Sequence, residues 1–388
     1  MQRLSVQALC ARIRRSRGGS GLGTWLLAAF GAAVLSGQSS QPIKDQPPTR
    51  SPALTDRDPQ PVILDGDAYD EMLRAGVSLK PAFESEPYHL ARALLGAEFV
   101  EYEATRWVVL SDANAQWTRE QAALLKRAHH QFLRYTRRIG LQPKPLRHKL
   151  VCVLFERRDE YREFARLYDG VTDEWISGYY SPKHDRVVFY NVATSQPKQV
   201  SSTRHRWVAG SDSRDAGDHR ATATTVHEAI HQLMFHTGVQ SPHIEYPLWI
   251  CEGLATAFET DDPDAAFGPD HEYAPRRERF VQLLRDDQLI ELRQLVTYAR
   301  MPDDSDETVQ AVYHESYALV MWMSRFRRAE LQAYLQSMLA EPPGRPTPQR
   351  QLELFEEAFG DVDRLQRRWL RYERRNAESH PVLHPVRE

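Results

Sequence analysis

The pattern of apolar positions changes near residue 220 of the chain. Before that point, short apolar runs alternate with amphipathic stretches. The continuously apolar run 150–155 predicts a buried strand, and residues 101–110 predict another strand that could pair with the segment before it. Residues 118–139 repeat apolar positions every three or four residues and predict a long helix, and a shorter helix is expected at 159–168.

Residues 176–190 have the pattern of a β-hairpin, because two runs rich in β-branched and aromatic residues flank the turn sequence Pro182-Lys-His-Asp. Residues 192–220 are polar and contain two glycines, and they predict a loop. After residue 221 nearly every segment has helical periodicity. The pattern therefore predicts an α+β fold, with a small mixed β-sheet followed by a mainly helical half.

The beginning of the chain has a different composition. Residues 1–40 contain five arginines and no acidic residue, and the eleven apolar residues 25–35 precede small polar ones. This order is typical of a secretory signal. Eleven residues are too few to span a bilayer, which takes about 20. We expect residues 1–37 to direct export to the periplasm, the cell envelope or the outside of the cell, and an uncleaved N-terminal anchor is the alternative.

The rest of the chain divides by composition. Residues 38–62 are rich in Pro, Gln and Ser and predict a flexible linker. A globular domain is expected over 63–375, with the sheet part in 63–191 and the helical part in 221–375, before a tail at 376–388. The full sequence of 388 residues is 41% apolar and 27% charged, as in soluble proteins. A net charge of −3 implies no strong attraction to nucleic acid.

Two cysteines, Cys152 and Cys251, follow the apolar leader. They are too few for a disulfide framework. Because Cys152 stands in the apolar run 150–155, we expect it to be a small core residue. A disulfide bond to Cys251 is the alternative.

A histidine pair marks the helix that is expected to begin near residue 221. His227-Glu228-Ala-Ile-His231 spaces two histidines by four positions, so both imidazoles lie on one helix face and can bind one metal ion. Glu228 lies beside them and can take a proton from a water molecule that a zinc ion activates. The alternative interpretation is a solvated helix face. A catalytic zinc ion needs a third protein ligand.

A candidate for that ligand is Glu252, which follows His231 by 21 residues and is expected to open a second apolar helix. Its neighbours include Trp249, Ile250 and Leu254. Burying a carboxylate among them is costly, and a metal ion would remove that cost. The next residue is a glycine, which leaves room for a close helix contact. The alternative is an ordinary surface glutamate at a helix start.

Together these motifs resemble those of the gluzincin metallopeptidases, such as thermolysin and the membrane alanyl aminopeptidases. The segment Trp249-Ile-Cys-Glu-Gly-Leu-Ala-Thr-Ala-Phe-Glu259 is similar to the aminopeptidase form, and closer still to the bacterial peptidase MA-like group of exported proteins. The resemblance covers residues 97–372, although only the two motifs are specific. It implies a thermolysin-like architecture with one Zn²⁺ ion held by His227, His231 and Glu252, and with Glu228 as general base.

The same resemblance suggests further roles. Glu259 would orient a ligand imidazole, with a solvent-facing side chain as the alternative. Tyr313 would stabilise the oxyanion, and His314 and Tyr317 compete for that role. The hairpin edge would bind an extended peptide by strand addition, through Gly178 and Tyr179.

The predicted activity is therefore zinc-dependent hydrolysis of peptide bonds in a peptide or protein substrate. The aminopeptidase motif Gly-x-Met-Glu-Asn is absent from the sequence, so recognition of a free amino terminus is not supported. Residues 192–220 have no counterpart in the resemblance. Two alternatives stay open: a zinc hydrolase that acts on a non-peptide amide or ester, and an envelope binding or scaffold protein with a vestigial metal site. The oligomeric state is not indicated.

Overall fold

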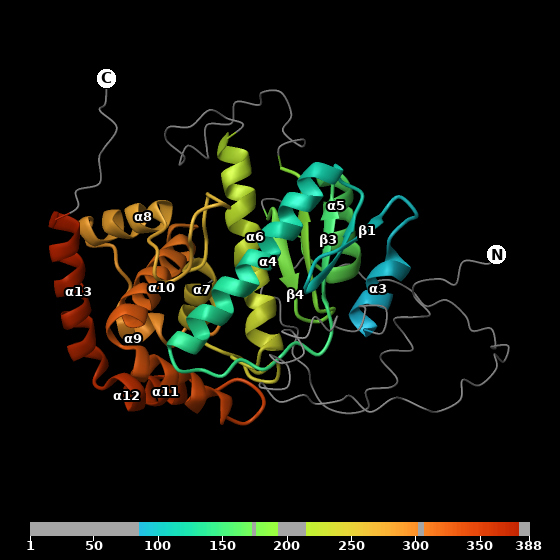
Figure 1. Cartoon of the computed structure of the whole chain (residues 1–388). Coiled ribbons are helices and arrows are strands. Elements are labelled where there is room, and N and C mark those ends of the chain that lie inside the picture. Colours follow the sequence, from blue (N-terminus) through green and yellow to red (C-terminus); the bar gives the residue numbers. More distant parts are fainter. Residues whose placement is uncertain (1–84, 173–175, 193–214, 302–305, 380–388) are drawn as a thin grey trace, which may run out of the picture.

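The computed structural model describes residues 85–172, 176–192, 215–301 and 306–379 (Figure 1). The expected leader 1–37, the linker 38–62 and most of the loop 192–220 lie outside the described residues.

The N-terminal part contains α3 (Glu86–Leu94), β1 (Val100–Glu103), β2 (Trp107–Ser111), α4 (Ala115–Arg138), β3 (Leu150–Phe155), α5 (Arg158–Phe164), the π-helix η2 (Ala165–Asp169), β4 (Gly178–Ser181) and β5 (Arg186–Tyr190). The C-terminal part contains α6 (Asp215–His236), α7 (Leu248–Thr256), α8 (Ala274–Arg285), α9 (Leu292–Leu295), α10 (Asp306–Phe326), α11 (Arg328–Leu339), α12 (Pro348–Phe359) and α13 (Val362–Ser379).

The five strands form one mixed sheet in the order β1-β2-β3-β5-β4. The two outer pairs are antiparallel, whereas β3 runs parallel to both of its neighbours. All six residues of β3 are buried, which explains why its sequence is continuously apolar. The arrangement confirms the predicted α+β class, with a small mixed sheet before a mainly helical half.

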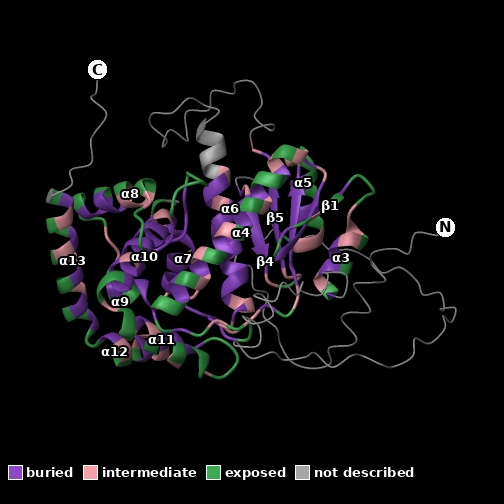
Figure 2. Ribbon diagram, viewed as in Figure 1, coloured by how far each residue is buried: buried purple, intermediate pink, exposed green. Residues whose placement is uncertain are grey.

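The two faces of the sheet have separate cores. Helices α4 and α6 lie on one face, and α3 and α5 lie on the other (Figure 1). Side chains of β4 alternate between these cores, so Tyr180 joins the core beneath α4 and α6 while Tyr179 joins the opposite one. Strands β2, β3, β4 and β5 are buried on both sides, whereas the edge strand β1 is partly exposed (Figure 2). Strand β4 is an edge strand in the described sheet, and it lies beside α6.

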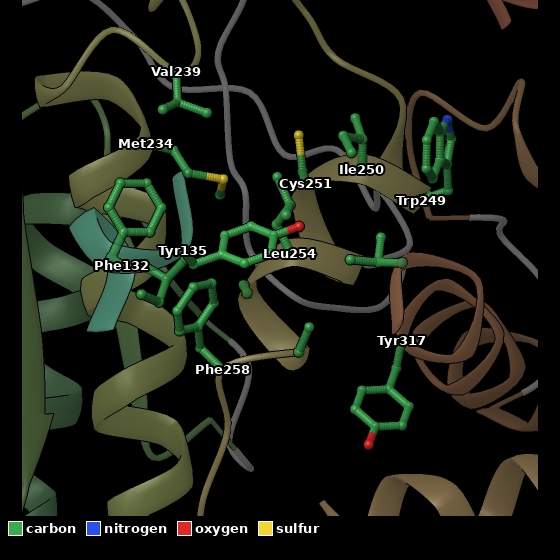
Figure 3. Close-up of a cluster of buried hydrophobic side chains, with 14 of the residues drawn as sticks. Phe132, Tyr135, Met234, Val239, Trp249, Ile250, Cys251, Leu254, Phe258 and Tyr317 are labelled. Carbon is green, nitrogen blue, oxygen red and sulfur yellow. The ribbon is translucent and has the colours of Figure 1, made fainter. Parts of the chain in front are cut away.

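Helix α6 joins the sheet part to the helical half. Its apolar residues share one core with those of α4 and α7, among them Phe132, Met234 and Leu254 (Figure 3). Helices α7 and α10 lie in backbone contact at Gly253, where an added Cβ would come within 2.7 Å of the Ser316 carbonyl oxygen. A glycine at this position therefore permits the close helix contact that the sequence suggested.

The two cysteines are both buried and free. Cys152 belongs to the core beneath α4 and α6, as expected, and Cys251 is part of α7. The alternative of a Cys152–Cys251 disulfide bond is therefore wrong.

Several boundaries differ from those that the sequence predicted. The segment 101–110 is two strands, β1 and β2, joined by a turn that the N–H of Ala104 closes on the Trp107 carbonyl. Helix α4 starts three residues early because the side chain of Asn114 caps its first turn. The helix expected at 159–168 is α5 continued by η2.

Two further boundaries concern the C-terminal half. Helix α6 begins at Asp215 rather than near residue 221, and α7 begins at Leu248, so Glu252 lies within that helix and does not open it. Helix α13 continues to Ser379. Among the described residues, the structure contains no helix both long and apolar enough to cross a bilayer.

Candidate metal centre

The histidine pair lies in the middle of α6, where the helix faces α7. Their Nε2 atoms are 3.1 Å apart. Glu252 of α7 places Oε2 at 3.2 Å from His227 Nε2 and at 3.6 Å from His231 Nε2. The structure therefore brings together the three side chains that the sequence named as metal ligands. The same three residues form a buried group of ligand atoms that could hold a metal ion.

The spacing of the three donor atoms fits a tetrahedral ion. Zinc bonds to histidine and carboxylate ligands are about 2.1 Å long, which separates two tetrahedral ligands by about 3.4 Å. The observed separations of 3.1–3.6 Å bracket that value. Glu252 is 2% exposed, and its Oε2 is buried without a hydrogen-bond partner among the described residues. Such an atom is costly to bury unless a cation meets it, so these residues fit a metal ion.

Glu259 sets the tautomer of His227. Its Oε1 lies 2.9 Å from Nδ1 of His227, and because a carboxylate only accepts, Nδ1 carries the proton and Nε2 is left with a lone pair. Arg276 of α8 forms two 2.7 Å hydrogen bonds to the two oxygens of Glu259. Glu259 is buried, so the alternative of a solvent-facing side chain is wrong.

The charges around the site favour a bound cation. Burial raises the pKa of Glu252, but attraction to His231 and His227 outweighs burial and holds the pKa well below its usual value. Burial also opposes the ionisation of Glu259, yet Arg276 and His227 lower its pKa to about 2. Burial lowers the pKa of His227, whereas the neighbouring carboxylates of Glu252 and Glu259 outweigh burial and raise it. The two carboxylates thus favour a positive charge here, which a divalent ion would supply.

Glu228 points from α6 toward the sheet. Its Oε2 accepts a 2.8 Å hydrogen bond from the backbone N–H of Tyr180 in β4. Burial raises the pKa of Glu228, and the nearby His227 and His231 oppose that shift. A carboxylate whose pKa is raised is better matched to taking a proton near neutral pH.

Of the three candidates on α10, Tyr313 has a ring contact with the histidine pair. Its ring centroid is 6.4 Å from that of His227, and the guanidinium of Arg276 lies 5.6 Å from its ring centre. Burial raises the pKa of Tyr313 well above its usual value, and Glu252 and Glu228 add to the shift, so its hydroxyl keeps its proton. Tyr317 instead accepts a 2.8 Å hydrogen bond from the N–H of Tyr273.

The hairpin residues named from the sequence serve different purposes. An added Cβ at Gly178 would collide with the Phe189 ring on β5 and come within 3.1 Å of Thr224 on α6, so a glycine here leaves room for that ring and for the helix. The side chain of Tyr179 lies on the opposite face of the sheet, and its hydroxyl donates to Asp169 at 2.7 Å. The backbone contact to Glu228 comes from Tyr180, one residue further along.

Sequence reasoning missed Tyr180 and Arg276. Alternation in a strand separates Tyr179 from Tyr180, but it does not say which of them faces the motif helix. Arg276 lies about 50 residues beyond the motif, among other arginines of α8, and only the tertiary packing brings it to Glu259.

A family model described as "Protein of unknown function (DUF1570)" matches residues 221–344. The matched region contains the three candidate ligands together with Glu228, Glu259 and Tyr313, and it ends before α12. It contains none of the sheet. A comparison with curated proteins found no match.

Proposed function

We propose that this chain is a zinc-dependent peptidase of the gluzincin type. The observation that supports the proposal most strongly is the convergence of Nε2 of His227, Nε2 of His231 and Oε2 of Glu252 at 3.1–3.6 Å from one another, with Glu228 beside them. Two histidines from one helix and a glutamate from the next are the ligand set of a catalytic zinc site, which keeps one position open.

The proposed reaction is hydrolysis of an amide bond. Zinc, when bound, supplies Lewis acidity, which lowers the pKa of water in its open position and polarises a carbonyl. Glu228 accepts a proton from the attacking water molecule while the oxygen of that water bonds to the carbonyl carbon. Tyr313 donates a hydrogen bond to the developing oxyanion. Glu228 then delivers the proton to the nitrogen as the C–N bond breaks, which gives a carboxylic acid and an amine.

The edge of the sheet favours a peptide over a small ester as substrate. Strand β4 ends the described sheet, and the N–H of Tyr180 on this strand reaches the proposed base. An extended peptide that pairs with this edge would place its backbone beside Glu228. The alternatives remain a zinc hydrolase of non-peptide amides or esters, and an envelope scaffold whose metal site is vestigial. We also propose that the chain acts outside the cytoplasm, on the basis of residues 1–37.

The substitution Glu228→Gln tests the proposal. Glutamine keeps the shape of the side chain and its acceptor oxygen but is not basic, so zinc content should stay at the parent level. Cleavage of casein or of a peptide library should fall by at least about 100-fold. Glu278→Gln is the matched control, because Glu278 is an exposed glutamate of α8, and this variant should cleave like the parent.

Three outcomes would contradict parts of the proposal. Equal activity in Glu228→Gln and the parent would remove Glu228 as the base. Cleavage of small esters without cleavage of peptides would favour the non-peptide alternative. Equal zinc content in His227→Ala and the parent after mild dialysis would favour the scaffold, since such sites bind tightly.

A further inference from the structure

A second group of potential metal ligands lies at the C-terminal end of α6. It consists of His148, which comes two residues before β3, Asp185 in the turn between β4 and β5, and His236, the last residue of α6. Each side chain offers a ligand atom, and these atoms all lie within 4.8 Å of one another. Nε2 of His236 donates a 2.7 Å hydrogen bond to Oδ1 of Asp185, and a cation bound here would take the place of that proton. The two imidazole rings meet edge to face, with centroids 5.3 Å apart. Three separate elements therefore converge here.

The tautomer of His148 suits a metal ligand. Its Nδ1 lies 2.9 Å from the backbone carbonyl oxygen of Lys149. Because a carbonyl only accepts, Nδ1 carries the proton, and Nε2 keeps the lone pair that a cation would take. A ring N–H donated to a backbone carbonyl is a usual way for proteins to orient a metal-binding imidazole.

Hydrogen bonds also hold the carboxylate of Asp185 in place. Its Oδ1 accepts from the Tyr180 hydroxyl at 3.2 Å and from Gln232 Nε2 at 3.4 Å. The amide of Gln232 is itself oriented, because its Oε1 accepts a 3.0 Å hydrogen bond from the buried indole N–H of Trp107. Asp185 further has a φ of 49°, a left-handed conformation that non-glycine residues seldom adopt. The surrounding side chains thus orient the carboxylate of this residue.

We infer that His148, Asp185 and His236 form a second divalent-cation site, suited to zinc or a similar first-row ion. Two imidazoles and one carboxylate are ligands that such ions accept. The side chains of His236 and Asp185 are 18% and 19% exposed, so a bound ion would keep contact with water. An ion there would fasten the hairpin turn and the start of β3 to the end of α6. The proposed catalytic site does not include any of these residues, so this inference stands independently of the proposed function.

The two groups are connected through Tyr180. Its backbone N–H donates to Glu228, and its hydroxyl donates to Asp185. A cation at the second site would hold the hairpin that presents this N–H. The site would therefore serve as a structural brace for the strand beside the proposed base. Its three ligands do not include a general base, which is a second difference from the proposed catalytic site.

Zinc stoichiometry of the full chain tests the inference. The parent should bind two equivalents at equilibrium, and Asp185→Asn should bind one, with affinity at the second site at least about 100-fold weaker. Asparagine retains the acceptor oxygen and tolerates a left-handed backbone, so the hairpin should keep its fold. The matched control is His130→Ala, which removes an exposed histidine of α4 and should leave both equivalents.

A variant of the first site distinguishes zinc bound there from zinc bound at the second site. His227→Ala should also bind one equivalent, and His227→Ala combined with Asp185→Asn should bind none. If the first site does not bind zinc, the parent should bind a single equivalent that Asp185→Asn removes and His227→Ala does not. The inference is overturned if Asp185→Asn and His148→Ala both bind as much zinc as the parent. Should Asp185→Asn fail to fold, the zinc content of His148→Ala decides.

Hydrogen exchange of the hairpin amides gives a second test of the bracing role of the second site. Adding zinc to His227→Ala, where only the second site remains, should slow exchange of the backbone amides of residues 178–190 by about tenfold or more, because opening the hairpin would release the ion. The effect should vanish when Asp185→Asn is added. Unchanged exchange on zinc addition, with zinc bound, would overturn the bracing role.

Discussion

Helix α6 contributes histidines to two histidine–carboxylate clusters that differ in their surroundings. The first, made of His227, His231 and Glu252, is at most 6% exposed and lies among further carboxylates. The second, made of His148, Asp185 and His236, is half-buried and holds one carboxylate. A buried carboxylate with an unsatisfied oxygen depends on a cation. A half-buried one can be satisfied by water and hydrogen bonds. This difference is the basis on which we propose a catalytic role for the first cluster and a bracing role for the second.

The strongest way to break this distinction is to delete one histidine from each cluster. His231→Ala removes a ligand of the buried site, and peptide hydrolysis should fall by at least about 1000-fold, because the Lewis acidity of zinc contributes several kcal/mol to the reaction. His236→Ala should lower the rate by about tenfold at most, since it acts only through the position of the hairpin. Initial rates on one peptide substrate provide the measurement. Equal losses in the two variants would show that the clusters do not have separate roles.

A substitution of Glu259, the residue that orients His227, should have a smaller effect. Glu259→Gln keeps an acceptor for Nδ1 but loses the charge that pairs with Arg276. Zinc affinity of the buried site should fall by 10- to 100-fold, a range typical of residues that support a ligand. Competition with a chromophoric chelator measures it.

The second cluster offers a contrast, because the backbone carbonyl of Lys149, rather than a side chain among the described residues, lies against Nδ1 of His148. Glu259→Gln should therefore leave zinc binding at that cluster unchanged. A loss at both clusters would indicate a general effect on the fold.

The buried cluster could be predicted from the sequence because the signals for it lie within short segments. The four-residue spacing of His227 and His231 depends only on helix geometry, and Glu252 stands out as a carboxylate in an apolar segment. Strand β3 was predicted with its full length for a similar reason, since a strand buried on both faces is apolar at every position. The α+β class followed from the change of period along the chain.

The second cluster was not predicted because it has no local signal. His148, Asp185 and His236 are separated by 37 and 51 residues, and only the pairing of β3 with β5 and the packing of the hairpin on α6 bring them together. The helix start at Asp215 was missed for a different reason, since the polar sequence before residue 221 resembles a loop.

The smallest expected effect comes from the residue that links the clusters. Tyr180→Phe removes the hydroxyl that donates to Asp185 at 3.2 Å and leaves the backbone N–H that donates to Glu228. The ring should keep its place, because it stacks on Phe235 with centroids 5.9 Å apart. A hydrogen bond of this kind contributes about 1 kcal/mol, so zinc affinity at the second cluster should weaken about fivefold.

That change is best measured in the His227→Ala background, where the second cluster is the remaining proposed site. Zinc titration of His227→Ala with and without Tyr180→Phe isolates the contribution of the hydroxyl. Affinity that is unchanged within error would mean that the hydroxyl does not orient Asp185 for a cation. A loss of 100-fold or more would mean instead that the substitution displaces the hairpin, and the link between the clusters would then be the position of the strand rather than a single hydrogen bond.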